Sequence, residues 1–141
     1  MIAIGSDHAG FPLKEEIKKH LEARGLEFKD VGTDSTASCD YPVYSNALCE
    51  KILAGDCDKG IIICGTGIGV SIVANRHKGI RCALCTDSYM ARLTREHNDA
   101  NVLAMGARVI GPGVAEEIVD VFLDTPFSEG KNHVRRIGMM D

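Results

Sequence analysis

The feature that most constrains the fold is a run of β-branched residues that leads into a glycine-rich turn. Ile61, Ile62 and Ile63 are followed by Cys64 and then by Gly-Thr-Gly-Ile-Gly. An apolar run of this length, bounded by glycine, predicts a strand covered on both faces, which is typical of a parallel sheet. The small apolar residues up to Asn75 predict a buried helix. The segment is therefore expected to form a strand–turn–helix unit at the carboxyl edge of the sheet, where ligands bind.

The glycines of this turn alternate, at Gly65, Gly67 and Gly69. Without side chains they leave backbone N–H groups open to a ligand, and the start of the next helix adds partial positive charge. We therefore expect an anion or a developing oxyanion there. The spacing is not G-x-G-x-x-G, because residue 70 is valine, and no Gly-Lys-Ser/Thr follows. Both absences argue against dinucleotide or ATP binding.

The remaining chain alternates between strand and helix patterns. Further strands are expected near residues 1–6, 26–31, 79–85 and 102–105, and helices near 12–25, 43–53, 87–97 and from 113 onward. Right-handed crossovers place such helices on both faces of the sheet. We predict one domain over residues 1–141, with a three-layer α/β/α Rossmann-like fold and a five-stranded parallel sheet. A C-terminal tail, at about 129–141, has room for a short helix.

Composition and charge exclude several classes of protein. Hydrophobic residues make up 45% and charged residues 26% of the chain, which argues against disorder. The apolar runs are far shorter than the roughly 20 residues of a membrane-spanning helix. The amino terminus lacks the basic region of a signal peptide, so we expect a cytoplasmic protein. A net charge of −4 gives no field that favours nucleic acid.

The six cysteines are expected to be free thiols, because the chain shows no secretory signal. Cys82 and Cys85 form a C-x-x-C, but within a strand an offset of three places their side chains on opposite faces. A metal site is therefore not expected, and neither is a cofactor. Cys64 differs from the others, because exposed amides and a helix start beside it favour a thiolate and an adjacent oxyanion hole.

Parallel topology brings several other polar residues to the edge that holds this turn. Asp7 and His8 follow the first strand, and Arg108 follows the fifth. Tyr41, which closes the loop before the second helix, is by itself more often a packing residue than a ligand contact. His97 shares a helix face with apolar residues, which is typical of a partly buried histidine, although a polar cluster follows it.

The order of these motifs resembles that of the type B ribose-5-phosphate isomerases, within a wider family that includes galactose-6-phosphate and allose-6-phosphate isomerases. The resemblance covers residues 1 to about 136. It rests on residues 5–10 (GSDHAG) with Leu13-Lys14, 40–42 (DYP), 64–69 (CGTGIG), Ala74-Asn75, 79–81 (GIR) and 97–101 (HNDAN).

The resemblance implies a metal-free aldose–ketose isomerase that interconverts ribose 5-phosphate and ribulose 5-phosphate in the pentose phosphate pathway. It assigns Cys64 as the base that moves a proton between C1 and C2 through an enediolate. His97, with Asp7, would open the furanose ring. The developing oxyanion would be held by Thr66 and by the amides of Gly65, Gly67, Ile68 and Gly69.

The resemblance also assigns the substrate contacts and an assembly. His8, Arg108 and Arg136 would hold the phosphate, and Tyr41 and Asn98 would contact sugar hydroxyls. Family members form homodimers or homotetramers whose sites are shared between subunits. His97, Asn98, Arg108 and Arg136 would then serve the neighbour's Cys64.

The tail departs from the family pattern at one position. Members with two tail arginines place the first where this chain has Asn132, so only Arg136 matches directly. Either Lys131, His133 or Arg135 compensates, or the affinity for phosphate is weaker than in those members.

Two other functions remain open from the sequence. An isomerase of six-carbon sugar phosphates would keep the same catalytic set and differ in the depth of its pocket. A non-catalytic sugar-phosphate-binding module would use the same loops without needing Cys64 or His97.

Overall fold

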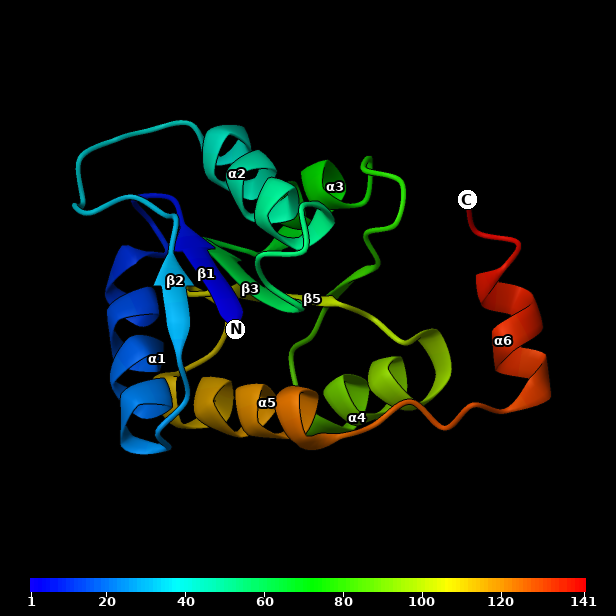
Figure 1. Cartoon of the computed structure of the whole chain (residues 1–141). Helices are drawn as coiled ribbons and strands as arrows, with labels where there is room; N and C mark the ends of the chain where they lie inside the picture. The colour runs from blue at the N-terminus through cyan, green and yellow to red at the C-terminus, as the bar shows by residue number, and fades with distance from the viewer.

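The isoleucine run forms the central strand of a five-stranded, all-parallel sheet with the order β2-β1-β3-β5-β4. The computed structural model describes all 141 residues (Figure 1). Its elements are β1 (Ile2–Ser6), α1 (Phe11–Ala23), β2 (Phe28–Asp30), α2 (Tyr41–Leu53), β3 (Lys59–Cys64), α3 (Ile68–Ala74), β4 (Cys82–Leu84), α4 (Ser88–Asn98), β5 (Val102–Gly106), α5 (Pro112–Asp124) and α6 (Lys131–Ile137).

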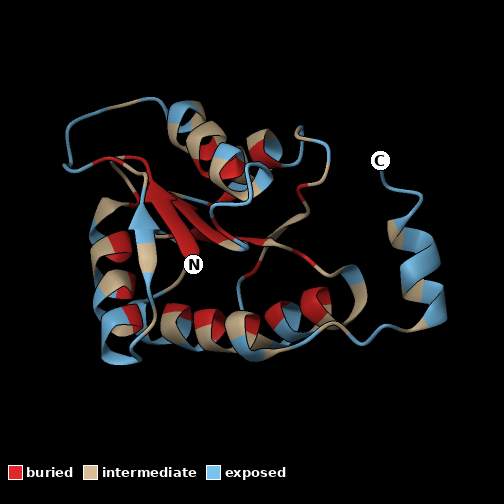
Figure 2. Ribbon diagram, viewed as in Figure 1, coloured by how far each residue is buried: buried red, intermediate tan, exposed pale blue.

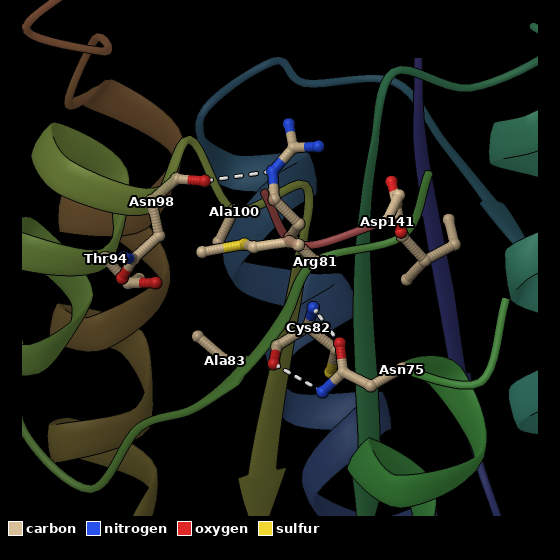
Figure 3. A pocket seen from close by; sticks show the side chains of 10 residues that line it. Asn75, Arg81, Cys82, Ala83, Thr94, Asn98, Ala100 and Asp141 are labelled. Carbon is tan, nitrogen blue, oxygen red and sulfur yellow. Dashed lines mark hydrogen bonds between the residues drawn. The ribbon is translucent and has the colours of Figure 1, made fainter. Parts of the chain in front are cut away.

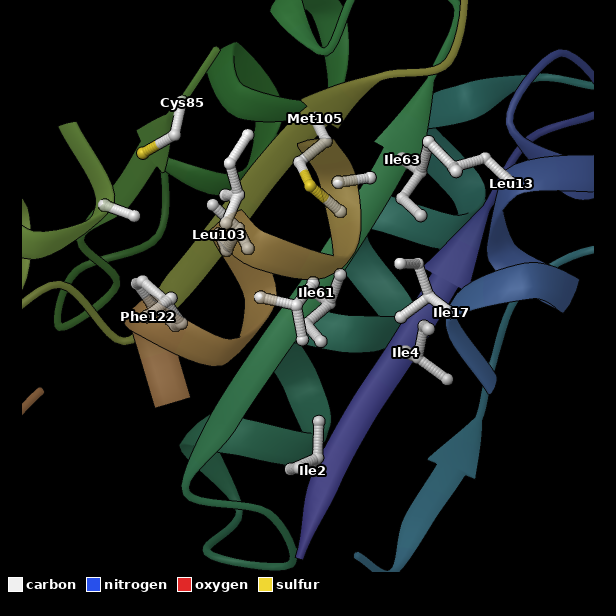
Figure 4. Packing of buried hydrophobic residues seen from close by; sticks show 14 of the residues in the cluster. Ile2, Ile4, Leu13, Ile17, Ile61, Ile63, Cys85, Leu103, Met105 and Phe122 are labelled. Atoms are coloured by element: carbon white, nitrogen blue, oxygen red, sulfur yellow. The ribbon is translucent and has the colours of Figure 1, made fainter. Parts of the chain in front are cut away.

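Helices cover both faces of the sheet, as the sequence predicts. On one face, α1, α4 and α5 pack against a core that includes Ile17, Ile61 and Phe122 (Figure 4). On the other face, α2 and α3 pack through residues such as Leu48 and Val70. The predicted three-layer α/β/α arrangement with five parallel strands is therefore confirmed.

Both edge strands are shorter than the sequence predicts. The N–H of Leu26 donates to the carbonyl of Leu21, which completes the turn after α1 and delays β2 until Phe28. Gly79 has a φ of +88°, and the N–H of Arg81 donates to Asn101 Oδ1 at 2.8 Å. β4 therefore begins only at Cys82.

Two helices also differ from the predicted bounds. α2 begins at Tyr41, two residues earlier than expected, because Pro42 suits the first turn of a helix. The tail contains the short helix α6, which packs beside the end of α4 and has no buried residue (Figures 1 and 2). None of the six helices combines the length and apolar character that membrane crossing requires.

Two asparagine side chains hold β4 in place. Asn75 accepts a hydrogen bond from the N–H of Cys82 at 2.8 Å and donates to its carbonyl at 2.9 Å (Figure 3). Asn101 accepts from the N–H of Arg81 and donates to the carbonyl of Gly79 at 2.9 Å. These side chains replace the backbone partners that a short edge strand lacks.

A buried lysine joins α1 to the loop that follows β2. The side chain of Lys14 is 1% exposed, and its Nζ donates to both oxygens of Asp30 and to the carbonyl of Thr33. Burial alone would raise the pKa of Asp30, but hydrogen bonds from Lys14, Lys18 and the Gly32 amide outweigh it and lower that pKa below 3.8. The resulting stabilisation is present above about pH 4 and is lost as the pH falls through the lowered pKa.

We expect Lys14→Met to destabilise the chain by about 3 kcal/mol, because it leaves a partly buried carboxylate without its main partner. Lys18→Met is the matched control. Its ammonium contacts the same carboxylate but is 22% exposed, so its loss is expected to cost less than about 1 kcal/mol. Urea unfolding of both variants at pH 7 measures the difference, and equal losses would contradict the prediction.

Candidate active site

The loops after β1, β3 and β5 meet at the carboxyl edge of the sheet. Their strands are direct neighbours, with Ser6 opposite Ile63 and Cys64 opposite Gly106. An open cavity of about 500 Å³ lies over these strand ends. It is lined by Asp7, His8, Ala9, Tyr41, Cys64, Gly65, Thr66, Ile68, Gly69, Ile72 and Arg108.

Cys64 ends β3 and lies at the base of this cavity, with 6% of its surface exposed. Its sulfur accepts a hydrogen bond from the N–H of Gly67 at 3.1 Å. Gly67 adopts a φ of +79°, and a Cβ there would lie 2.5 Å from a methyl group of Leu84. Only glycine fits this turn, and the turn aims an amide dipole at the sulfur, an arrangement that stabilises negative charge on it.

The amides of the turn are not equivalent. The N–H of Ile68 donates to Thr66 Oγ1 at 3.2 Å, and that of Gly67 donates to the thiol. The N–H groups of Gly65, Thr66 and Gly69 donate no hydrogen bond within the chain. Three amides beside the thiol are therefore available to an oxygen of a ligand.

Asp7 and His8 are held by backbone amides. Asp7, with 6% exposure, accepts a hydrogen bond from the N–H of Gly10 at 3.0 Å. His8 Nδ1 lies 3.2 Å from the N–H of Cys39, which donates to it. The neutral His8 ring therefore carries its proton on Nε2, which makes that nitrogen a donor.

Arg108 and Tyr41 line the cavity beside different glycines of the turn. A Cβ at Gly65 would lie 3.5 Å from Arg108 Nη1, so the guanidinium passes over the glycine turn. Arg108 forms no ion pair with a carboxylate of this chain, which leaves its charge available to an anionic ligand. The Tyr41 ring lies against Gly69, where a Cβ would come within 2.8 Å of two ring carbons.

Several of the other thiols have raised pKa values. Burial raises the pKa of Cys49 to about 11 and that of Cys85 to about 12, and it also raises the pKa of Cys82. These groups remain uncharged thiols at neutral pH. Cys82 and Cys85 pack into the cores on opposite faces of the sheet, as the offset of three predicts. Nowhere do three His, Cys, Asp or Glu side chains gather in a way that could hold a metal ion.

Four predicted site residues do not line the cavity. Gly67 is one of them, because its N–H turns to the thiol of Cys64. Asn98 lines a different cavity, of about 410 Å³, beside β4 (Figure 3). His97 stacks on His133 of α6, and Arg136 is exposed on the same helix. Arg108, in contrast, lines the same cavity as the Cys64 of its own chain.

Two residues near these sites have no role predicted from the sequence. Ile72 lines the cavity one helical turn after Ile68, and that spacing of four was a usable signal. Arg81 donates from Nε to the carbonyl of Asn98 at 2.9 Å and from Nη2 to that of Asp99 at 2.9 Å. Arg81 therefore fixes the turn that carries His97 and Asn98, and no pattern in the sequence indicates this contact.

The chain is similar to known sugar-phosphate isomerases along nearly its whole length. A family model described as Ribose/Galactose Isomerase matches residues 2–140. Ribose-5-phosphate isomerase B of Escherichia coli is 48% identical over 96% of this chain and 91% of its own length. Galactose-6-phosphate isomerase subunit LacB of Clostridium acetobutylicum is 40% identical over 100% of this chain and 82% of its own length.

A solved structure agrees over almost the whole fold. The crystal structure of a ribose 5-phosphate isomerase from Thermotoga maritima superposes with a TM-score of 0.97 at 52% identity, covering 99% of this chain and 96% of that one. The family model and the solved relative thus each match nearly the whole chain. The chain belongs to the ribose/galactose isomerase family.

Proposed function

We propose that this protein is a metal-independent aldose–ketose isomerase that interconverts ribose 5-phosphate and ribulose 5-phosphate, a reaction of the pentose phosphate pathway. The observation that carries the proposal is the Cys64 thiol at the base of an open cavity, with one amide aimed at its sulfur and three free amides beside it. A base and an oxyanion hole are therefore adjacent, which is what proton transfer next to a carbonyl requires.

In the proposed reaction, the Cys64 thiolate removes the proton from C2 of the open-chain aldose. The electrons of the C–H bond form an enediolate, whose charge on O1 is held by the free amides of Gly65, Thr66 and Gly69. The proton returns to C1, and the O2 hydroxyl proton passes to O1, so that the ketose forms with no net oxidation. Thr66 Oγ1 holds the turn in shape through Ile68 and borders the same cavity.

The phosphate is proposed to lie at the side of the cavity lined by His8 and Arg108. His8 offers a donor at Nε2, and Arg108 offers a guanidinium with no internal partner. A grip on the phosphate, far from the reacting carbons, orients C1 and C2 over the thiol. Tyr41 borders the space between and is proposed to contact a sugar hydroxyl.

We further propose that His97, Asn98 and Arg136 enter this cavity from a second copy of the chain, in a homodimer that can pair into a homotetramer. Helices in a parallel α/β fold run opposite to the strands, so the end of α4 lies at the amino edge, away from Cys64. The free side of α6 carries exposed Val134, and the exposed Met139 and Met140 follow it. Such a surface fits contact with another subunit.

In that assembly, His97 together with Asp7 opens the furanose before proton transfer, and Arg136 adds a second positive charge at the phosphate. A cytoplasmic location fits the six free cysteines.

Six-carbon sugar phosphates are the second candidate substrates. The relative LacB, 40% identical to this chain, is named for galactose 6-phosphate. The cavity is open to solvent, and exposed Ile68 and Ile72 border it on α3.

We expect kcat/KM for ribose 5-phosphate to exceed that for allose 6-phosphate and galactose 6-phosphate by at least about tenfold, because one extra carbon displaces either the phosphate or C2 from its partner. Coupled assays of the purified protein with EDTA present measure all three. A higher value for either hexose phosphate would reassign the substrate. Activity that disappears with EDTA would contradict the metal-independent mechanism.

Replacing the base tests the mechanism directly. We expect Cys64→Ala to lower kcat on ribose 5-phosphate by at least about a hundredfold, with a similar KM, because it removes a positioned base. Cys57→Ala is the control, since this buried thiol precedes β3 at the opposite edge of the sheet. Full activity of Cys64→Ala would show that another group is the base.

Mixing two inactive variants tests whether the site is shared. Cys64→Ala and His97→Asn are each expected to be inactive as homodimers. A heterodimer would combine the intact Cys64 of one chain with the intact His97 of the other in one of its two sites. Random mixing should therefore restore about a quarter of wild-type activity. Refolding the two chains together and assaying the mixture measures this, and an inactive mixture would place His97 in its own subunit's site.

A further inference from the structure

Two histidines from different helices stack on each other at the end of α4. The ring centroids of His97 and His133 are 4.2 Å apart, and the ring planes differ by 14°. His97 belongs to α4 and His133 to α6, and both are half-buried. No other pair of aromatic rings in the chain is stacked. The proposed function gives His97 a role and leaves His133 without one.

The segment before α6 is tied to the last turn of α4. Arg95 Nε donates to the carbonyl of Thr125 at 3.1 Å, and both the N–H and the hydroxyl of Ser128 donate to the carbonyl of Glu96. Glu96 directly precedes His97. The chain between α5 and α6 is therefore anchored at Glu96, directly beside His97, the residue that α6 covers.

α6 is placed so that one side chain lies on the His97 ring. His133 and Ile137, one helical turn apart, are the only half-buried residues of α6, and the others are exposed. Gly130, just before the helix, leaves room for the imidazole, since a Cβ there would lie 3.0 Å from His133 Cδ2. The anchored segment before α6 and the half-buried face of α6 thus both hold His133 on the His97 ring.

We propose that His133 is a positioning residue for His97. The stacked ring covers one face of the His97 imidazole and restricts its rotation, so that a ring nitrogen points at the sugar of the neighbouring site. This inference rests on the proposed function, in which His97 opens the furanose. It adds a residue that touches neither substrate nor reacting atoms and acts only through His97.

The stack also links the proposed phosphate contact and the orientation of His97 to the same helix, α6. Arg136 follows His133 by three residues on α6 and therefore lies on a neighbouring part of the same helix surface. The helix that presents Arg136 to the phosphate thus also fixes the orientation of His97. Binding of the phosphate by Arg136 would then hold α6 in place and, through the stack, fix His97 at the other end of the sugar.

The stack itself is tested without any substrate. In the full-length protein, the ring current of His133 should shift the His97 ring-proton NMR resonances upfield. His133→Ala is expected to remove this shift, and His133→Phe, which keeps a flat ring, is expected to retain it. Unchanged His97 resonances in His133→Ala would mean that the rings do not stack in solution, and the inference would fail.

The positioning role is tested by kinetics on the same variants. His133→Ala is expected to lower kcat on ribose 5-phosphate by about tenfold with little change in KM, since a misplaced group loses effectiveness steeply. His133→Phe should restore most of that loss. A rise in KM with unchanged kcat would instead make His133 a phosphate contact. Loss of activity in His133→Phe, with its stack intact, would mean that the imidazole itself reacts. Either result overturns the proposal.

Isotope exchange separates ring opening from proton transfer. Ribulose 5-phosphate is acyclic, so its C1 hydrogen can exchange in D2O through Cys64 alone. The measured quantity is the ratio of deuterium in the recovered ketose to the amount of aldose formed. We expect this ratio to be higher in His133→Ala than in the wild type. Ile137→Val, which trims the other docking residue of α6, should leave the ratio unchanged. An equal rise there would assign the effect to helix docking and contradict the proposal.

The controls keep the two proposals distinct. Thermal unfolding of each variant shows whether it is folded. If the wild-type protein turns over no aldose phosphate, the proposed function fails, whereas the NMR comparison still decides whether His133 stacks on His97. If the wild type is active and His133→Ala matches it in kcat and in exchange ratio, only the positioning role fails.

Discussion

The close packing of the turn after β3 against the end of β5 is the constraint on which the site depends. A Cβ at Gly106 would lie 2.5 Å from the carbonyl oxygen of Thr66, so no larger residue fits there without moving the turn. With glycine in place, the N–H groups of Ala107 and Arg108 donate to the carbonyls of Cys64 and Gly65, both at 2.9 Å. The thiol, the free amides and the guanidinium are thereby set by one hydrogen-bonded unit of two strand ends.

Much of this edge could be predicted from the sequence, because parallel topology alone brings the strand ends together. Cys64 ends a strand, and Asp7, His8 and Arg108 follow strands within two residues, so the order of elements was enough to collect them. Which amides of the turn bond within the chain and which stay free for a ligand could not be predicted. It depends on the left-handed conformation of Gly67, which turns its N–H toward the sulfur, and a glycine permits that conformation without requiring it.

The sequence was less informative about the residues at the other edge. His97 and Asn98 look like site residues in a motif, yet in the folded chain they end a helix that runs away from Cys64. The neighbouring Arg81, Asn75 and Asn101 are no less polar, but they bind backbone groups of β4, of the segment just before it and of the α4 turn. A polar side chain looks the same in a sequence whether its partner is a carbonyl or a ligand, and only the tertiary contacts separate the two.

The side-chain amide of Asn75 affects whether the sheets of two copies of this chain can pair edge to edge. By pairing with both backbone groups of Cys82, it occupies the outer edge of the sheet as a further strand would. The opposite edge, β2, is only three residues long and ends in Lys29 and Asp30. Neither margin offers the row of unpaired amides that lets sheets from separate molecules fuse into a continuous one. Extension of the sheet from one copy to another is thus disfavoured at both margins.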